Sequence, residues 1–304
     1  MKRQNSALRQ NKAAGPMARD QKKTTPVTSP LVSPAWLAEH LEDPTVRIFE
    51  ISSKQDDTRY REGHIPGALW FFWKDICWHR TDREFISPKD LAKRLGAVGV
   101  RPQDTLVLYG DPVQYGTYAF WSFTMAGHPN LRLLDGTRTR WAKEGRPLTR
   151  DIPLYTAVDY PPRRGDSSMR VGRDEVRAGL GKPGRLLLDV RSPEEYSGER
   201  VMPYPGFDHG AERGGRIPGA VHLYYKSFLN DDDSYKSPAE LHAIFQQVGA
   251  TPEQAAEIIS YCRLSHRATL TWFAMRYILG YRNVKIYDGS WTEWGSIVGF
   301  PIER

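Results

Sequence analysis

The stretch IISYCRLSHRATLTWFAMRYILG, residues 258–280, predicts a strand, a tight loop and a helix in immediate succession. Residues 258–261 form a short apolar run that is typical of a buried strand. Between residues 268 and 279 apolar side chains recur every three or four positions, which predicts an amphipathic helix, and Gly280 follows as its C-terminal cap. The loop 262–267 therefore lies where a strand ends and a helix begins.

Cys262 opens this loop. The N–H groups at a helix N-terminus favour negative charge, and Arg263, His266 and Arg267 add positive charge nearby. A lone cysteine is often a small buried hydrophobe, but such cysteines are not normally flanked by cations. We therefore interpret Cys262 as a nucleophile beside an anion site, and Cys77, which lies among aromatic residues, as a packing residue.

The composition is typical of a globular protein with room for two domains, with 304 residues, 39% hydrophobic and 26% charged. No apolar run approaches the roughly 18 residues that a membrane span needs. Two cysteines give no disulfide framework, and eight histidines show no metal-ligand spacing. We expect a cytoplasmic monomer without metal, cofactor or membrane partner.

The net charge of +7 belongs almost entirely to the N-terminus. Residues 1–30 hold seven lysines and arginines against one aspartate, so the rest of the chain is close to neutral. This segment lacks the apolar core of a secretory signal, and its composition predicts a disordered basic tail. A nearly neutral body does not fit a nucleic-acid partner.

The chain contains an internal repeat whose spacing drifts from 139 to 153 residues, with an insertion in the second copy. The matched pairs include His64–Ala68 with Arg216–Ala220, Leu108-Tyr109 with Ser260-Tyr261, and Asp135-Gly136 with Asp288-Gly289. We predict a first domain over residues 31–150, a Pro-rich and Arg-rich linker over 151–168, and a second domain over 169–304.

Each copy alternates strands with helices, which predicts an α/β fold with a mostly parallel sheet and helices on both faces. The expected strands are Val46–Ile51, Thr105–Tyr109, Leu131–Leu134, Leu186–Val190, Glu257–Tyr261 and Val284–Tyr287. The expected helices are Pro34–Leu41, Lys89–Leu95, Arg173–Leu180 and Ala239–Gln247. Ligands of such folds collect at the carboxyl ends of strands, which is where Cys262 falls.

The first copy has Gly110 opposite Cys262, and its loop over residues 110–116 contains neither a thiol nor a cation. This copy is therefore expected to be non-catalytic and to form one wall of the cleft.

Three blocks resemble the rhodanese family of sulfurtransferases, and the likeness runs from about residue 31 to 304. YREGHIPGALWF, residues 60–71, is similar to its N-terminal signature, and VKIYDGSWTEW, residues 284–294, is similar to its C-terminal one. The third block is the six-residue cysteine loop. The resemblance implies two tandem rhodanese domains, the second catalytic, and transfer of a sulfane sulfur through a Cys262 persulfide.

The resemblance also implies substrate-binding residues. Arg191 matches the family arginine that contacts the donor's anionic group, and Arg263 matches the residue after the cysteine in thiosulfate-type loops. Leu264 stands where such loops usually have lysine, and Ser265, His266 and Arg267 replace their Gly-Val-Thr run. We expect Arg267 or His266 to supply the missing charge, with thiosulfate as donor and cyanide or a thiol as acceptor.

Several assignments stay open on the sequence alone. His266 is either an acid–base group or a solvent-facing cation, Asp189 is expected to cap or orient the loop, and Glu293 is expected to fix the closing turn. The alternatives to a thiosulfate sulfurtransferase are a 3-mercaptopyruvate sulfurtransferase and a non-catalytic rhodanese-like carrier or interaction module. Cysteine phosphatases have longer loops between Cys and Arg than residues 262–267 provide.

Overall fold

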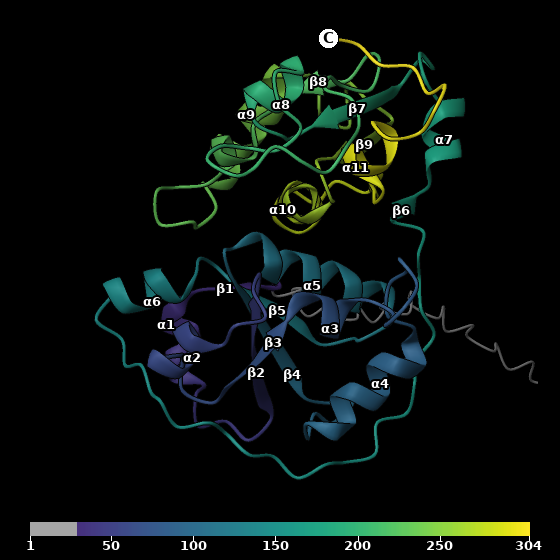
Figure 1. Ribbon diagram of the computed structural model, residues 1–304. Coiled ribbons are helices and arrows are strands. Elements are labelled where there is room, and N and C mark those ends of the chain that lie inside the picture. Colours follow the sequence, from purple (N-terminus) through teal and green to yellow (C-terminus); the bar gives the residue numbers. More distant parts are fainter. Residues whose placement is uncertain (1–28) are drawn as a thin grey trace, which may run out of the picture.

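The computed structural model describes residues 29–304, which form two α/β units (Figure 1). The predicted tail of residues 1–30 lies almost wholly outside this range. Each unit contains a five-stranded sheet, and all strand pairs in both sheets are parallel. The predicted fold class is therefore confirmed.

The first sheet has the strand order β1-β5-β4-β2-β3. Its strands are β1 (Leu31–Val32), β2 (Val46–Ser52), β3 (Ala68–Phe72), β4 (Thr105–Asp111) and β5 (Leu131–Leu134). Its helices are α1 (Pro34–Glu39), α2 (Thr58–Glu62), α3 (Trp73–Cys77), α4 (Pro88–Ala97), α5 (Gln114–Met125) and α6 (Arg138–Lys143). Side chains alternate along β2, so that Ile48 and Phe49 pack into different apolar clusters on the two faces. Both faces of the sheet are therefore covered.

The second sheet has the matching order β6-β10-β9-β7-β8, as expected for a duplicated domain. Its strands are β6 (Arg170–Val171), β7 (Arg185–Asp189), β8 (Val221–His222), β9 (Glu257–Tyr261) and β10 (Val284–Tyr287). Its helices are α7 (Arg173–Ala178), α8 (Pro193–Ser197), α9 (Pro238–Gln247), α10 (His266–Phe273) and α11 (Ser290–Trp294), with a 3₁₀ turn over Tyr225–Phe228 and a π turn over Ala274–Ile278.

Ser-Pro pairs at equivalent places in the two copies explain where α4 and α9 begin. The Ser87 hydroxyl accepts the Asp90 N–H at 3.1 Å, and the Ser237 hydroxyl accepts the Glu240 N–H at 3.4 Å. Each proline occupies the first helical position, where a missing N–H costs nothing. These local signals are why the predicted helices agree closely with the observed ones.

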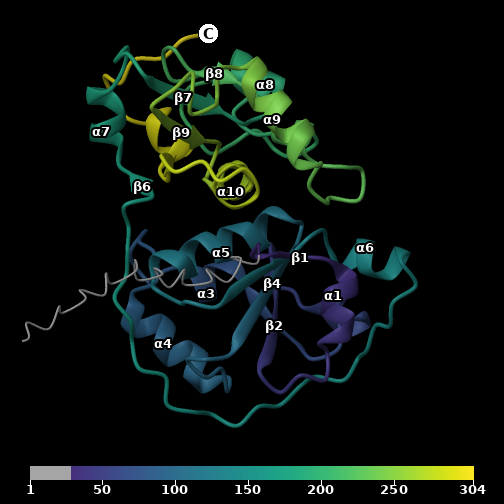
Figure 2. The same cartoon turned by 180° about the vertical axis from the view of Figure 1, so that it is seen from behind.

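The segment between α6 and β6 runs along the first unit without helix or strand (Figure 2). The Val158 N–H donates to the Gly96 carbonyl at 2.9 Å, and the Asp166 N–H donates to the Met125 carbonyl at 2.8 Å. The Tyr155 hydroxyl donates to the Gly67 carbonyl at 3.1 Å. The connection is therefore fastened to the first unit, while its predicted bounds of 151–168 stay a prediction.

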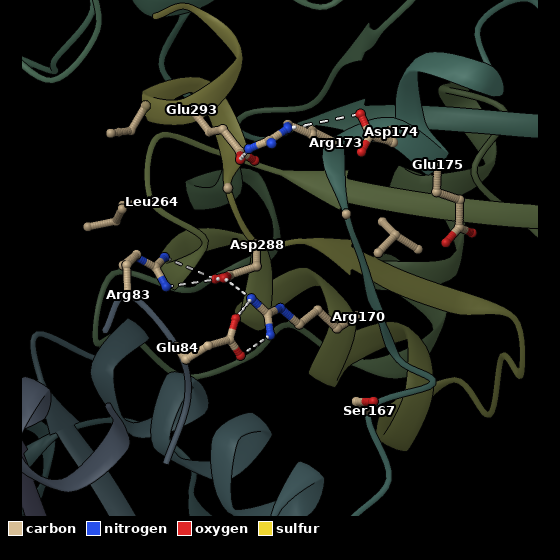
Figure 3. A pocket seen from close by; sticks show the side chains of 14 residues that line it. Arg83, Glu84, Ser167, Arg170, Arg173, Asp174, Glu175, Leu264, Asp288 and Glu293 are labelled. Carbon is tan, nitrogen blue, oxygen red and sulfur yellow. Dashed lines mark hydrogen bonds and ion pairs between the residues drawn. The ribbon is translucent and has the colours of Figure 1, made fainter. Parts of the chain in front are cut away.

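The two units meet around a cavity of about 690 Å³, whose wall carries a network of ion pairs (Figure 3). Arg83 and Glu84 reach this wall from the first unit, and Arg170 and Asp288 reach it from the second. Leu264 of the cysteine loop also lines the cavity. The back of the loop is therefore in contact with the domain interface.

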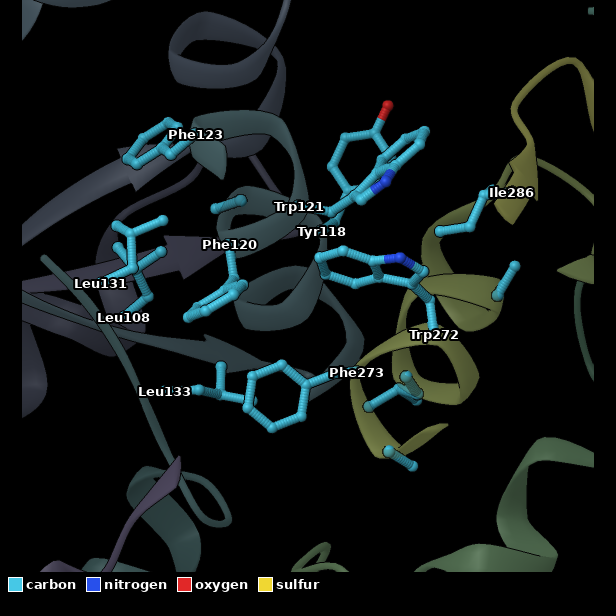
Figure 4. Packing of buried hydrophobic residues seen from close by; sticks show 14 of the residues in the cluster. Leu108, Tyr118, Phe120, Trp121, Phe123, Leu131, Leu133, Trp272, Phe273 and Ile286 are labelled. Atoms are coloured by element: carbon cyan, nitrogen blue, oxygen red, sulfur yellow. The ribbon is translucent and has the colours of Figure 1, made fainter. Parts of the chain in front are cut away.

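Helix α10 is buried on every side, because it lies between its own sheet and α5 of the first unit (Figures 1 and 4). The sequence predicted an amphipathic helix here, and the structure buries its polar residues together with the apolar ones. Its polar residue Thr269 hydrogen-bonds across the interface to Thr117, with 2.8 Å between the hydroxyl oxygens. These two threonines are 152 residues apart, so equivalent positions of the repeat meet, as at an interface between two like subunits.

Candidate active site

Cys262 lies directly after β9 and is 1% exposed, at a cavity of about 310 Å³. The cavity is lined by Cys262, Arg263, Leu264, His266 and Arg267 of the loop, together with Gln114, Tyr115, Met202, Pro203, Tyr204, Tyr224, Tyr225 and Lys226. Gln114 and Tyr115 belong to the first unit, which thus forms one wall of this cavity. The strand–loop–helix arrangement brings together most of the residues that the sequence singled out.

The cysteine loop is held by the segment that follows β10. The Ser290 hydroxyl accepts the N–H groups of Cys262 and Ser265 at 3.3 and 3.2 Å and donates to the Tyr287 carbonyl at 2.9 Å. The Trp291 N–H donates to the Cys262 carbonyl at 2.9 Å. The C-terminal signature therefore fixes the backbone of the loop, a role that sequence reasoning did not assign to Ser290.

Several backbone donors of the loop remain available to a ligand. Within residues 29–304, the N–H groups of Arg263, Leu264, Arg267 and Ala268 have no hydrogen-bond acceptor. Such N–H groups in a loop that opens a helix favour an anion.

Arg267 lines the cavity, but its charge is balanced. Its guanidinium forms two hydrogen bonds with the Glu195 carboxylate, at 2.6 and 2.8 Å, and Glu195 is fully buried. Burial alone would lower the pKa of Arg267, and the Glu195 carboxylate more than reverses this, so the pKa is raised. Glu195 lies 72 residues away in the sequence, which gives no signal for this pairing.

Arg191 is fully buried and is not among the residues that line the cavity. Its guanidinium binds both Asp189 carboxylate oxygens, at distances down to 2.6 Å, and lies 4.6 Å from the centre of the Trp291 ring. Burial lowers the pKa of Arg191, and Asp189 raises it by more. Asp189 thus orients Arg191, while contact between Arg191 and a donor stays a prediction.

His266 lies in a cage of aromatic rings from the first unit and is 8% exposed. Its ring centroid lies 4.3 Å from Trp73, 4.7 Å from Tyr115 and 4.2 Å from Tyr118. Burial, followed by the nearby Arg263, Arg83 and Arg267 side chains, holds its pKa well below the usual value. The expectation that His266 faces solvent is therefore wrong, and its burial together with the neighbouring arginines favours the neutral ring.

Ser265 is fully buried and does not line the cavity. Its hydroxyl shares one proton between the Asp288 carboxylate at 2.9 Å and the Leu264 carbonyl at 2.8 Å. Its backbone φ of 61° is unusual for a residue other than glycine. Ser265 therefore supports the loop from behind. Glu293 accepts the Tyr287 hydroxyl at 2.8 Å and pairs with Arg173 at 2.7 Å, which places it at the turn that closes the sheet, as expected.

Arg263 and Lys226 are the cations of the cavity that form no ion pair with a carboxylate of the described residues. Arg263 was expected from the sequence, whereas Lys226 was missed. Lys226 aligns with Lys74 of the first copy at a spacing of 152, but nothing in the sequence places it beside Cys262. The wall formed by Met202, Pro203 and Tyr204 comes from the insertion in the second copy.

Residues 29–304 show neither a metal-ligand cluster nor a membrane-spanning helix. No group of three or more His, Cys, Asp and Glu side chains is arranged to hold a metal ion. None of the helices described for this range has the length and apolarity needed to cross a membrane.

Comparison with known proteins decides the family. The model of the rhodanese-like domain matches the chain twice, over residues 33–144 and 172–297. The chain belongs to the rhodanese family. The matched ranges contain every strand of the two sheets except the edge strands β1 and β6, and Cys262 lies in the second range.

The sequence alignments with two relatives span nearly the whole of both rhodanese-like domains. The sulfur carrier protein TtuD of Thermus thermophilus is 44% identical over 280 residues, which are 90% of this chain and 96% of the relative. A protein of Haloferax volcanii named "Putative thiosulfate sulfurtransferase" is 39% identical over 280 residues, with the same coverage.

Solved structures support the fold. The anaerobic ergothioneine biosynthesis enzyme from Chlorobium limicola, in complex with trimethyl histidine, aligns with a TM-score of 0.77 at 24% identity. The alignment covers 90% of this chain and 69% of that one. At this level of identity the likeness concerns the rhodanese fold alone.

Proposed function

We propose that this rhodanese moves a sulfane sulfur from thiosulfate to a thiophilic acceptor through a persulfide on Cys262. The observation that carries the proposal is the position of Cys262, at a cavity that also contains two cations with no carboxylate partner among residues 29–304. The coarser statement, that the chain is a rhodanese-type sulfurtransferase or sulfur carrier, rests on its family and on its relatives.

The proposed reaction is a double displacement. The Cys262 thiolate attacks the outer sulfur of thiosulfate, the sulfur–sulfur bond breaks, and sulfite leaves with the electron pair of that bond. The acceptor then attacks the outer sulfur of the persulfide and restores the thiolate. With cyanide as acceptor, the product is thiocyanate.

The cavity offers two kinds of support for the charges in this reaction. Arg263 and Lys226 are suited to the sulfonate end of the donor and to the leaving sulfite, because charged hydrogen bonds to oxyanions are strong. The N–H groups of the loop are suited to the persulfide sulfur. Arg267 is less available, since Glu195 already binds it.

The relatives favour a second candidate for the acceptor step. One relative at 44% identity is named a sulfur carrier protein. If this chain acts in the same way, its acceptor is the thiol or another nucleophile of a protein partner. Both cysteines of the chain are free, which fits a reducing compartment such as the cytoplasm.

The proposal is tested by thiocyanate formation from cyanide, with thiosulfate and 3-mercaptopyruvate as parallel donors. We expect wild type to use thiosulfate faster, and we expect Cys262→Ala to be inactive with both donors. Faster turnover of 3-mercaptopyruvate would keep the reaction class and overturn the donor assignment. Equal activity of wild type and Cys262→Ala would overturn the proposal.

Lys226→Met and Arg263→Met test the donor site. Each variant loses a charged hydrogen bond worth about 1.5–3 kcal/mol, so we expect the KM for thiosulfate to rise about tenfold or more. Lys74→Met is the matched control, because Lys74 occupies the equivalent position of the first domain and does not line the cavity at Cys262. An equal rise in KM for Lys74→Met would contradict this assignment.

A further inference from the structure

We propose that Asp288 is a positioning residue for the cysteine loop and that it ties this loop to the first domain through Arg83. The inference rests on the proposed sulfur transfer at Cys262. It names a residue that supports this transfer but does not touch the substrate. Asp288 lies just after β10, at the centre of the ion network in Figure 3.

The Asp288 carboxylate is shared between the loop and two arginines. Oδ1 accepts the Ser265 hydroxyl at 2.9 Å and Arg83 Nη2 at 3.2 Å. Oδ2 accepts Arg83 Nη1 and Arg170 Nη2, each at 3.2 Å. Asp288 is 3% exposed, so its negative charge depends on these partners.

Arg83 brings the first domain into this network. It precedes α4 on the first domain, and its guanidinium carbon lies 4.0 Å from the centre of the Trp78 ring. The neighbouring Glu84 also links the domains, because its carboxylate accepts two hydrogen bonds from Arg170, at 2.6 and 2.7 Å, but it forms no hydrogen bond with the loop. Arg83 contacts the same buried carboxylate that accepts the Ser265 hydroxyl, so it is a side chain through which the first domain reaches the loop.

Ser265 explains why the loop needs this support. Its left-handed backbone conformation is disfavoured for a residue with a side chain and persists only where neighbours hold it. The Asp288 carboxylate holds the side chain, and the Ser290 hydroxyl holds the N–H. Ser265 lies between Cys262 and the start of α10, so its conformation sets where the free N–H groups lie.

The repeat supplies a matched control. Asp135 is the equivalent of Asp288 in the first domain, and its Oδ1 accepts the Tyr235 N–H of the second domain at 2.9 Å. Asp135 also pairs with Arg140 at 3.1 Å. Asp135→Asn therefore weakens an equivalent contact between the domains. The loop beside that contact has Gly110 where the second domain has Cys262.

The test compares Arg83→Gln, Arg83→Lys and Asp135→Asn for kcat, KM, thermal unfolding and the rate of Cys262 alkylation by iodoacetamide, mapped on peptides. Coupling through such networks typically changes function about 3- to 30-fold, and we expect Arg83→Gln to lower kcat and change the alkylation rate by that order. We expect Arg83→Lys to retain part of the wild-type kcat and of the wild-type alkylation rate. We expect Asp135→Asn to leave kcat and the alkylation rate unchanged.

Two variants of Ser265 separate the hydroxyl from backbone strain. Ser265→Ala keeps a side chain at positive φ without its anchor, whereas Ser265→Gly adopts this φ freely. We expect Ser265→Gly to retain more activity than Ser265→Ala. Combining Arg83→Gln with Ser265→Ala should lower kcat by less than the product of the two single effects, since both act through Asp288.

Equal kinetics and alkylation for Arg83→Gln and Asp135→Asn would overturn the inference, because the contact would then serve only to hold the domains together. The alkylation rate does not depend on any sulfur donor. A wild type that turns over no donor would therefore count against the proposed function, while an alkylation rate that Arg83→Gln leaves unchanged would count against the role of Asp288.

Discussion

Two of the arginines assigned to substrate binding are already paired with buried carboxylates. Arg191 binds Asp189, and Arg267 binds Glu195. A buried guanidinium without a counter-charge is unstable, so the fold provides the carboxylate before any substrate arrives. Such residues contribute to the shape of the site even where the substrate does not touch them.

We predict that Arg191→Met lowers the free energy of unfolding by about 3–5 kcal/mol, because it leaves the Asp189 carboxylate buried and unpaired. Urea unfolding at neutral pH measures this loss. Adding Asp189→Asn should restore part of the stability. A variant with unchanged stability and a much higher KM for thiosulfate would instead show that Arg191 serves mainly as a donor-binding residue.

Two buried histidines make stability depend on pH. Burial, followed by Arg163, lowers the pKa of His128 to about 4, and burial followed by nearby arginines also holds the pKa of His266 well below its usual value. Unfolding restores a pKa of about 6.5, so below this pH the unfolded state binds more protons and stability is lost as the pH falls.

Between pH 7 and pH 5 we expect His128 to account for a loss of about 2 kcal/mol in the free energy of unfolding. Urea unfolding of wild type and His128→Gln at both pH values measures the difference. The two proteins should lose different amounts of stability on acidification, with the smaller loss in His128→Gln. An equal loss would mean that His128 is protonated in the folded protein.

Residues of the loop could be predicted because they are contiguous. A strand, a loop and a helix in succession place Cys262, Arg263 and Arg267 at one cavity whatever surrounds them. Lys226 and Tyr115 could not be predicted, because they reach the cavity from distant segments. The neutral state of His266 depends on rings of the other domain, which its own neighbours in the sequence do not reveal.

Helix α10 shows the limit of periodicity as a guide to elements. Apolar spacing identified the helix, but it does not say what covers the remaining face. Here α5 covers that face, and the polar residues Thr269 and Thr271 are buried with it. The two helices form the centre of an apolar cluster that runs through both domains, shown in Figure 4.

We predict that Phe273→Ala, at this centre, lowers the free energy of unfolding by about 3–5 kcal/mol. Phe273 packs edge to face on Phe120 of α5, with 5.0 Å between ring centroids. The double variant with Phe120→Ala should lose less than the sum of the single losses, by about 0.5–1.5 kcal/mol. Trp141→Ala, in a separate cluster of the first domain, is the control and should add to Phe273→Ala.

At the scale of the whole molecule, the internal repeat was the most informative feature of the sequence. It predicted two sheets of the same kind, and the structure has the same strand order in both. It did not predict how the two domains meet. That contact depends on pairs such as Thr117 with Thr269 and Arg83 with Asp288, whose members lie 152 and 205 residues apart.

Gly110, which stands in the first domain where the second has Cys262, predicted a supporting role for that domain. The structure adds what that support consists of: Gln114 and Tyr115 at the cavity, the aromatic cage around His266, and Arg83 behind the loop. That the first domain is non-catalytic stays a prediction.

The most direct measurement of the central claim is the mass of the protein after incubation with thiosulfate and removal of excess donor. The account predicts that wild type gains one sulfur atom, on the peptide that contains Cys262, and loses it when cyanide is added. Cys77→Ser should gain the same atom, and Cys262→Ser should gain none. Sulfur on Cys77, or none on Cys262 in active wild type, would contradict the account.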